Sequence, residues 1–167
     1  MPRSARCIAV FSIAVLLLTS GLTCQASVPD PAAAAYVLME ADSGRVLLAR
    51  NEEQRRSIAS TTKIMTCLIA LEHSALTDKV TVRREHLREG SSMYLAEGET
   101  LTMEELLYGL MLPSGNDAAE CIADHCGGEG GSRQFVAWMN EKARMLGMTR
   151  TAFANPSGLD EAGHRSC

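Results

Sequence analysis

The chain has 167 residues, the size of one domain, and its apolar fraction of 46% is enough for a packed core. Aromatic residues make up only 4% while Met is frequent, so the core should be aliphatic and helix-rich. The formal net charge of −4, without a basic run or an aromatic platform, gives no indication of a nucleic-acid partner.

The N-terminus has the organisation of an export signal. Arg3 and Arg6 precede an apolar stretch over residues 8–18, and small and polar residues follow as far as Ala26. This pattern is typical of a Sec-type signal peptide. The apolar stretch is shorter than a transmembrane helix usually requires. We expect residues 1–26 to be cleaved off and the remainder to be extracytoplasmic, in the cell envelope. An uncleaved anchor is the alternative.

A linker and a β-hairpin are predicted next. Residues 27–34 form the linker, which contains two prolines. Two apolar runs over 36–41 and 45–49 are joined by Asp-Ser-Gly at 42–44, where glycine supplies the positive φ of a turn. The first run is apolar at successive positions, so it should be covered on both faces. Because two strands form only a marginal sheet, the hairpin implies a larger sheet than this chain supplies.

A helix buried on all sides is predicted over residues 64–71, which are nearly all apolar. Lys63 then lies at the buried end of that helix, where an amine is costly unless it has a purpose. Residues 79–82 are a candidate for a short strand. Thr102 and Glu105 form a capping box at the start of a further helix.

The remaining helices are marked by their ends. Pro113 stops the capped helix, and Asn116 or Asp117 caps the next one, which ends in the glycines of 127–131. The last helix opens at Ser132 and closes at Gly147. Its apolar stripe consists of Phe135, Met139, Ala143 and Leu146.

Ser60 and Lys63 are the first candidate catalytic residues. Their spacing of three places them on one helix face, about one turn apart, with the hydroxyl within reach of the amine. Lysine can accept the proton only when neutral near pH 7, so its pKa must fall well below about 10.4, which burial can achieve. Ser60 would lie in the first turn of the helix, where its N–H can act as one oxyanion donor.

Ser114-Gly115-Asn116 is the second candidate element. Ser114 could relay a proton to a leaving amine, and Asn116 could orient Lys63 or hold a substrate amide. Each pattern alone also has a structural interpretation: Ser60 as an N-cap, Lys63 as a snorkelling residue and the second element as a turn. Together, Ser-x-x-Lys and Ser-x-Asn are two of three elements found in the serine penicillin-interacting enzymes.

Around these residues the sequence resembles a known family, the serine-type D-alanyl-D-alanine carboxypeptidases. These are low-molecular-mass penicillin-binding proteins of the peptidase S11 type. The resemblance runs from about residue 35 to 165. The matching segments are ASTTKIMT at 59–66, GSSMYL at 90–95, LLYGLML at 106–112, SGNDAA at 114–119, TAFANPSGL at 151–159 and Gly-His at 163–164.

The resemblance implies an α+β fold, the penicillin-binding/β-lactamase-like transpeptidase fold, with an antiparallel sheet flanked by helices. It makes Ser60 the nucleophile, Lys63 the proton acceptor, Ser114 the second catalytic serine and Asn116 a substrate-binding residue. The implied reaction removes the terminal D-alanine from a peptidoglycan stem peptide through an acyl-enzyme on Ser60. β-Lactams would acylate the same serine. No metal and no organic cofactor is implied.

The third element of the family, Lys-Thr-Gly on a later strand of the sheet, is not in this sequence. We therefore expect residues 35–167 to be an incomplete, truncated D,D-peptidase catalytic domain. A C-terminal membrane anchor would lie in the missing region. Because loss of one oxyanion donor typically costs about 10²–10³ in rate, we expect residues 27–167 not to turn over a D-Ala-D-Ala peptide.

Three alternatives remain open. A class A-like β-lactamase would carry Ser-Asp-Asn where this chain has Gly115, and also a Glu-x-x-Leu-Asn segment, which is absent. A non-catalytic penicillin-binding fragment is favoured by the missing third element, and a fragment unable to fold is the third alternative. His164 is interpreted as a loop residue that supports the fold, because a Ser/Lys pair needs no histidine.

Four cysteines lie outside the expected signal peptide, at 67, 121, 126 and 167, and their spacings are not those of a disulfide framework. Cys121 and Cys126 would point about 140° apart on a helix. His125 beside Cys126 could suggest a metal, but a zinc site needs four convergent ligands. We interpret these cysteines, with Cys67, as buried packing residues.

Overall fold

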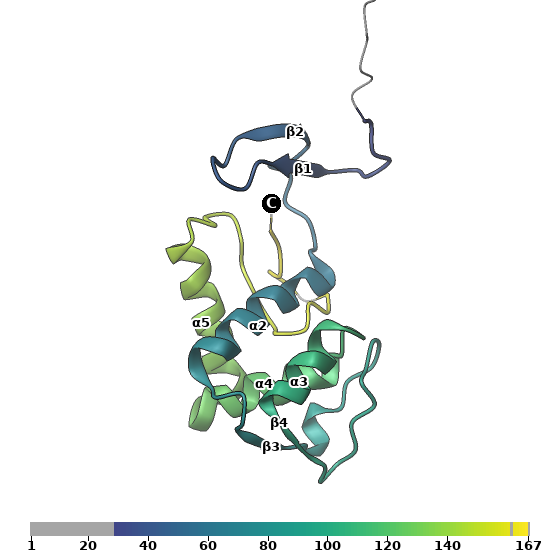
Figure 1. The fold of residues 1–167 in the computed structure, drawn as a ribbon, viewed down its shortest axis with the longest axis vertical. Helices are drawn as coiled ribbons and strands as arrows, with labels where there is room; N and C mark the ends of the chain where they lie inside the picture. Colours follow the sequence, from purple (N-terminus) through teal and green to yellow (C-terminus); the bar gives the residue numbers. More distant parts are fainter. Residues whose placement is uncertain (1–28, 161, 167) are drawn as a thin grey trace, which may run out of the picture. The chain divides into compact units, whose positions relative to one another are not determined.

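The structure is a computed structural model that describes residues 29–160 and 162–166 (Figure 1). Residues 35–167 form one compact unit, and residues 29–34 belong to a separate N-terminal unit. The predicted signal peptide, residues 1–26, lies outside the described residues. The described helices and short strands agree with the expected α+β class.

The predicted hairpin is confirmed. Strands β1 (Tyr36–Met39) and β2 (Val46–Arg50) pair antiparallel, with Leu38 opposite Leu48. The Glu40 carboxylate accepts hydrogen bonds from the backbone N–H of Asp42 and Ser43, at 3.0 and 2.7 Å, and so closes the turn.

The prediction that the first strand is covered on both faces is wrong for this structure. Val37, Leu38 and Met39 are 52%, 55% and 52% exposed, and because successive strand residues point to opposite sides, both faces are open. Val46 and Leu47 on β2 are similarly exposed. The cause is the size of the sheet, since β1 and β2 have no third strand beside them within the described residues.

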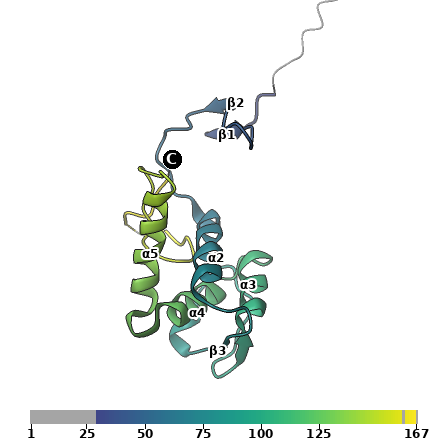
Figure 2. The same cartoon turned by 60° about the vertical axis from the view of Figure 1, so that its left-hand side comes forward.

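Helix α2 (Thr62–His73) packs against three other helices, α3 (Met103–Met111), α4 (Asn116–Gly127) and α5 (Gly131–Met145) (Figures 1 and 2). The four helices enclose one hydrophobic core, which is mainly aliphatic and also contains Phe135. On α2 the buried apolar residues are Met65, Ile69 and Ala70.

Helix α2 is not buried on all sides, so that prediction is wrong. Ile64 and Leu71 are 63% and 53% exposed. Only the side of α2 that faces the other helices is covered, and both residues lie off that side. Lys63 is buried, as predicted, with 2% of its surface exposed.

The predicted strand is present as β3 (Lys79–Thr81), and it pairs antiparallel with β4 (Thr100–Thr102), which the sequence analysis missed. The capping box of α3 is confirmed. Thr102 Oγ1 accepts from the backbone N–H of Glu105 at 3.2 Å, and the Glu105 carboxylate accepts from the N–H of Thr102 at 2.7 Å. Helix α3 ends at Met111, two residues before Pro113.

The predicted caps of the later helices need correction. The N-cap of α4 is Gly115, because the side chains of Asn116 and Asp117 are directed to other partners. Helix α5 opens at Gly131, one residue earlier than expected. Its buried stripe holds for three of the predicted residues but not for Leu146, which is 57% exposed where the helix ends.

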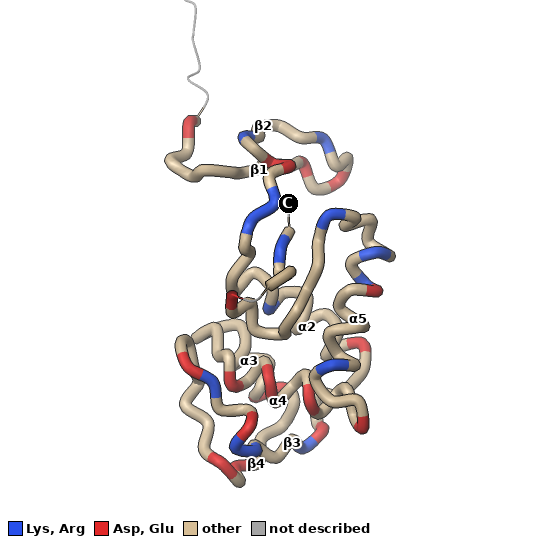
Figure 3. The backbone as a smooth tube through the Cα atoms, turned by 180° about the vertical axis from the view of Figure 1, so that it is seen from behind, with Lys and Arg blue, Asp and Glu red and all other residues tan. Residues whose placement is uncertain are grey.

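Acidic and basic residues are interspersed along the chain (Figure 3). Within the described part, no helix combines the length and the apolar character needed to cross a membrane.

Candidate active site

Ser60 lies in a short 3₁₀ turn, η1 (Ala59–Thr61), directly before α2, rather than in the first turn of the α-helix as predicted. Its side chain is exposed. Ala59 before it has a φ of +43°, which is uncommon for a residue with a Cβ and is often found at functional sites. Ser60 lines a cavity of about 310 Å³. The other lining residues are Ala59, Gly90, Ser91, Asn116, Ser157, Gly158, Leu159 and Asp160.

The Lys63 amine is held by two acceptors from distant parts of the chain. Nζ donates to Asn116 Oδ1 at 2.8 Å and to the backbone carbonyl of Ser157 at 2.6 Å. A neutral amine has two N–H bonds and one lone pair, so these contacts occupy both hydrogens and leave the lone pair available. Among the described residues no hydrogen bond joins Lys63 to Ser60. In enzymes without bound substrate, hydrogen bonds between catalytic groups are often long and shorten only when substrate binds.

The electrostatics favour the neutral form of this amine. Burial lowers the pKa of Lys63, and the negative charge of Asp117 opposes this without cancelling it, so the pKa lies below its ordinary value. The sequence analysis required this direction of shift. Lys63 therefore has the burial, the hydrogen bonds and the direction of pKa shift that a general base needs.

Asn116 and Ser114 differ in how they relate to this site. Asn116 contacts Lys63 and lines the Ser60 cavity, and its Nδ2 donates to the carbonyl of Glu89 at 2.9 Å. Ser114 does not line that cavity. Its φ is +61°, and its buried Oγ has no hydrogen-bond partner within the described residues. The predicted proton relay through Ser114 stays a prediction.

A loop over residues 155–160 forms one wall of the site, and the sequence analysis did not assign it a role. Besides the Ser157 carbonyl on Lys63, the Pro156 carbonyl accepts from Thr66 Oγ1 at 2.7 Å. Gly158 has a φ of +87°, and a Cβ there would lie 1.9 Å from the Ala59 carbonyl oxygen. Backbone carbonyls carry no residue-type signal, but Gly158, which both the positive φ and this close approach require, is a signal in the sequence that could have pointed to the loop.

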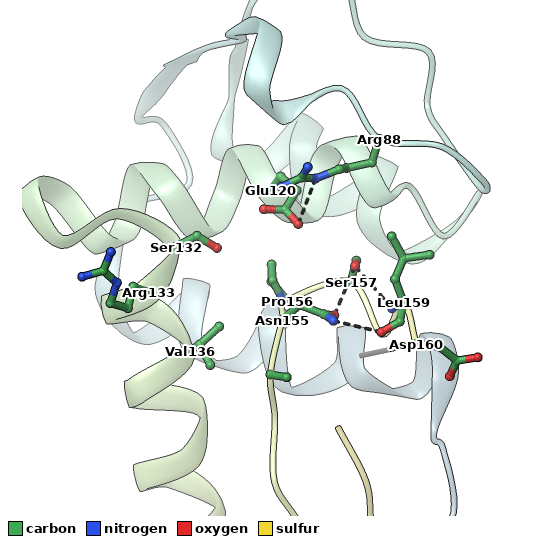
Figure 4. Close-up of a pocket in the computed structure, with 11 residues that line it drawn as sticks. Arg88, Glu120, Ser132, Arg133, Val136, Asn155, Pro156, Ser157, Leu159 and Asp160 are labelled. Atoms are coloured by element: carbon green, nitrogen blue, oxygen red, sulfur yellow. Dashed lines mark hydrogen bonds and ion pairs between the residues drawn. The ribbon is translucent and has the colours of Figure 1, made fainter. Parts of the chain in front are cut away.

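The same loop separates the Ser60 cavity from a second, larger one. That cavity is about 590 Å³ and shares Ser157, Leu159 and Asp160 with the first (Figure 4). Asn155 fixes the loop internally: its Oδ1 accepts from the N–H of Gly158 at 2.8 Å, and its Nδ2 donates to the Leu159 carbonyl at 2.9 Å. The wall of the candidate site is therefore a hydrogen-bonded turn rather than a loose segment.

His164 supports the start of α2. It is buried, and its Nδ1 accepts from the N–H of Ala154 at 3.1 Å, so the ring proton is on Nε2 and can be donated to Thr62 Oγ1 at 2.7 Å. This agrees with the interpretation of His164 as a residue that supports the fold, since its contact is with a buried threonine of α2.

The three described cysteines are free thiols, and Cys167 lies outside the described residues. Burial, with nearby carboxylates, raises the pKa of Cys121 to about 12 and that of Cys126 to about 11, and burial also raises the pKa of Cys67. They are therefore protonated and weakly reactive at neutral pH. The described side chains include no group of three or more His, Cys, Asp or Glu residues placed to hold a metal ion.

Comparison with known proteins places this geometry in a family. A profile of the D-alanyl-D-alanine carboxypeptidases, peptidase S11, matches residues 23–167. D-alanyl-D-alanine carboxypeptidase DacF of Bacillus subtilis is 42% identical over 137 residues, which are 78% of this chain and 34% of that protein. DacD of Escherichia coli is 37% identical over 178 residues, covering 96% and 45%. The chain thus spans less than half the length of these curated relatives.

The structural comparison agrees. The D-alanyl-D-alanine carboxypeptidase structure from Mycobacterium tuberculosis superimposes with a TM-score of 0.76 at 37% identity, covering 85% of this chain and 55% of that one. The expected α+β fold of the penicillin-binding D,D-peptidases is thereby confirmed over the part that the chain spans. Sequence and structure together show that the chain belongs to the D-alanyl-D-alanine carboxypeptidase family, peptidase S11.

Proposed function

We propose that this chain carries the nucleophile of a serine D-Ala-D-Ala carboxypeptidase that trims peptidoglycan stem peptides. The observation that supports the proposal most directly is the buried Lys63 amine beside the Ser60 cavity, with both of its N–H bonds held by Asn116 and Ser157. A lysine held in this way, with a lowered pKa, is suited to accept a proton from a neighbouring hydroxyl.

The proposed reaction has two stages. Ser60 Oγ attacks the carbonyl carbon of the penultimate D-alanine while its proton passes to Lys63 Nζ. The peptide C–N bond then breaks, and the terminal D-alanine leaves with a proton on its nitrogen, for which Ser114 is the proposed relay. Water attacks the Ser60 ester, releases the shortened peptide and restores the hydroxyl. Asn116 is proposed to bind the substrate in addition to its hydrogen bond with Lys63.

β-Lactams fit the same proposal, because opening the lactam ring by Ser60 forms the corresponding ester. We further propose that the protein acts outside the cytoplasm. The signal-peptide pattern of residues 1–26 supports this location, and so does the substrate, which is a component of the cell wall.

The test is covalent labelling by benzylpenicillin of the full-length protein, meaning a form that includes the Lys-Thr-Gly element, read by intact-mass spectrometry and peptide mapping. One adduct is expected, on Ser60, and Ser60→Ala should remove it. Ser91→Ala is the matched control, because Ser91 lines the same cavity and should leave the adduct in place. D-alanine release from a D-Ala-D-Ala peptide then reports the hydrolytic step. An adduct on another residue, penicillin binding that survives Ser60→Ala, or rapid nitrocefin turnover would contradict the proposal.

A further inference from the structure

A buried carboxylate beside the candidate site has no role in the reaction as described. Asp117 is 1% exposed, and both of its oxygens are fully engaged. Oδ1 accepts from the backbone N–H of Met93 at 3.1 Å and of Ala118 at 2.9 Å. Oδ2 accepts from Ser92 Oγ at 2.5 Å and from the N–H of Leu95 at 3.1 Å.

These contacts outweigh the cost of burying a charge. Burial on its own would raise the pKa of Asp117, but the hydrogen bonds from Ser92 and from the backbone N–H groups of Leu95, Met93 and Ala118 hold it below its ordinary value. Asp117 is therefore ionised at neutral pH, with a fixed negative charge at the start of α4.

The carboxylate also fixes an unusual piece of backbone. Tyr94 has a φ of +64°, a conformation that a bulky residue rarely adopts. The residues on either side of Tyr94 donate their N–H groups to Asp117, and the N–H of Tyr94 itself donates to Ser92 Oγ at 2.8 Å. Asp117 thus determines the shape of residues 92–95.

This segment is continuous with one that holds Asn116. The Asn116 N–H donates to the Ser91 carbonyl at 2.8 Å, and its Nδ2 donates to the Glu89 carbonyl. The remaining amide atom, Oδ1, accepts from Lys63. Residues 89–95 therefore surround the start of α4, and the direction of the Asn116 side chain depends on their staying there.

We propose that Asp117 is a positioning residue for Ser60 acylation: its carboxylate clamps residues 92–95 onto the start of α4 and so keeps Asn116 aligned on Lys63. The proposal rests on the function proposed above. Asp117 acts through its neighbours, since no hydrogen bond joins it to Ser60 or Lys63 among the described residues. Its charge acts on the Lys63 amine through space.

The other charged or titratable groups near Asp117 come from three elements. Lys63 interacts with it electrostatically from α2. Arg88, which precedes residues 92–95, lines the same cavity of about 250 Å³ as Asp117. Glu120 and Cys121 follow on α4 itself. The charge of Asp117 raises the pKa of Lys63, and Lys63 is the base in the proposed reaction, so the pH dependence of acylation is expected to report on this pair.

The test compares Asp117→Asn with Asp124→Asn in the full-length protein. Asp124 is on the same helix but pairs with Arg83, away from the Ser60 cavity. The second-order rate of Ser60 acylation by a fluorescent penicillin is measured against pH. Asp117→Asn should lower the rate at neutral pH about tenfold or more, because Asn116 is no longer held in line. It should also move the acid limb to lower pH, because removing the negative charge lowers the pKa of Lys63 further. Asp124→Asn should do neither.

Ser92→Ala separates the clamp from the charge. It removes one hydrogen bond and keeps the carboxylate, so the rate should fall by a smaller factor while the midpoint of the acid limb stays in place. If Asp117→Asn does not fold, Ser92→Ala decides the question: a wild-type acylation rate in Ser92→Ala would then overturn the clamp.

Amide hydrogen exchange gives a readout independent of activity. The N–H groups of Met93 and Leu95 should exchange about tenfold or more faster in Asp117→Asn, and Asp124→Asn should leave them unchanged. If the wild-type protein is not acylated at Ser60, the proposed function is wrong. The role of Asp117 in holding residues 92–95 is then tested by amide hydrogen exchange alone. A folded Asp117→Asn variant with wild-type exchange at both amides, or with the wild-type rate and acid limb, would overturn the proposal.

Discussion

The proposed chemistry depends on one amine, that of Lys63, whose surroundings disfavour its charged form. Lys63 is almost fully buried, and both of its hydrogen-bond acceptors are uncharged oxygens. An amide and a carbonyl can bind a neutral amine as well as an ammonium ion, whereas a close carboxylate would favour the ammonium. The charge of Asp117 is close enough to oppose the effect of burial but not to reverse it.

Replacing the proposed base, Lys63, by a permanent cation should strongly slow acylation. In Lys63→Arg the side chain carries a permanent positive charge, because a guanidinium cannot be deprotonated in the pH range of proteins. The rate of Ser60 acylation by benzylpenicillin, followed by mass spectrometry, should fall by about 10²–10⁴-fold, the usual contribution of a general base. Lys142→Arg is the matched control, because Lys142 pairs with Glu72 near the surface. A Lys63→Arg variant that is acylated at the wild-type rate would contradict the assignment of the base.

The same amine should leave a signature in the pH dependence of stability. Its pKa is lower in the folded state than in the unfolded chain, so the unfolded chain binds the proton more tightly. Protonation therefore favours unfolding between the two pKa values, and the wild type should gain stability relative to Lys63→Met as the pH is raised from 7 toward 10. Urea unfolding of both proteins across that range measures the difference. A difference that is constant with pH, or that changes in the opposite sense, would contradict a lowered pKa.

At the scale of elements, the site is a junction between the start of α2 and the loop at 155–160. The tightest point of this junction is Gly158, against the carbonyl of Ala59. Any side chain there must push the loop away from η1 or push Ser60 out of its place. The loop and Ser60 therefore share one steric requirement.

Comparing Gly158→Ala with Gly98→Ala separates the effect of the steric contact with Ala59 from the effect of a positive φ. Both glycines have a similar positive φ, +87° and +86°, but a Cβ at Gly98 has no neighbour within 4 Å. Gly98→Ala should cost about 1–2 kcal/mol for the left-handed conformation. Gly158→Ala should cost about 1–3 kcal/mol more for the clash and should also slow Ser60 acylation. Urea unfolding gives the free energies. Equal losses in the two variants would show that the contact with Ala59 is not restrictive.

The elements also show what could be read from the sequence. The hairpin, β3, the capping box of α3 and the burial of Lys63 were predictable, because each depends on a local pattern or on immediate neighbours. Strand β4 was missed because three residues that run directly into a helix carry little strand pattern.

The contacts that complete the site depend on tertiary structure, and the sequence could not supply them. The acceptor on Lys63 from Ser157 is a backbone carbonyl 94 positions away, which any residue type could provide. Asn116 and Asp117 were predicted as helix caps because both residue types are good caps, but in the structure their side chains hydrogen-bond to other segments. Ile64 and Leu71 are apolar without being buried, which the sequence pattern alone could not distinguish.

At the scale of the whole molecule, the hairpin and the helices differ in how well they are covered. The helices enclose a core, whereas both faces of β1 are half exposed. The chain covers 55% of the Mycobacterium tuberculosis structure that it resembles, so a large part of that protein has no counterpart in the aligned region. An open, apolar, two-stranded sheet also presents unpaired edges, which favour association between chains.

Making the hairpin more polar should therefore reduce self-association. Leu38→Thr combined with Leu47→Thr keeps a good strand propensity and removes two side chains that are 55% and 49% exposed. The monomer fraction in sedimentation velocity should rise. Leu146→Thr is the control, since Leu146 is 57% exposed but lies at the end of α5. If Leu146→Thr has the same effect as the double variant, or if neither has any, the hairpin is not the surface through which chains associate.

The two bonds on Lys63 bridge 53 and 94 positions of the chain, so both partners arrive late in synthesis. Until α4 and the 155–160 loop dock onto α2, the amine remains hydrated and protonated, and Ser60 lacks its proposed base. Under the proposed mechanism, Ser60 of a nascent or partly folded polypeptide therefore cannot yet attack a substrate, and completion of the tertiary structure activates it.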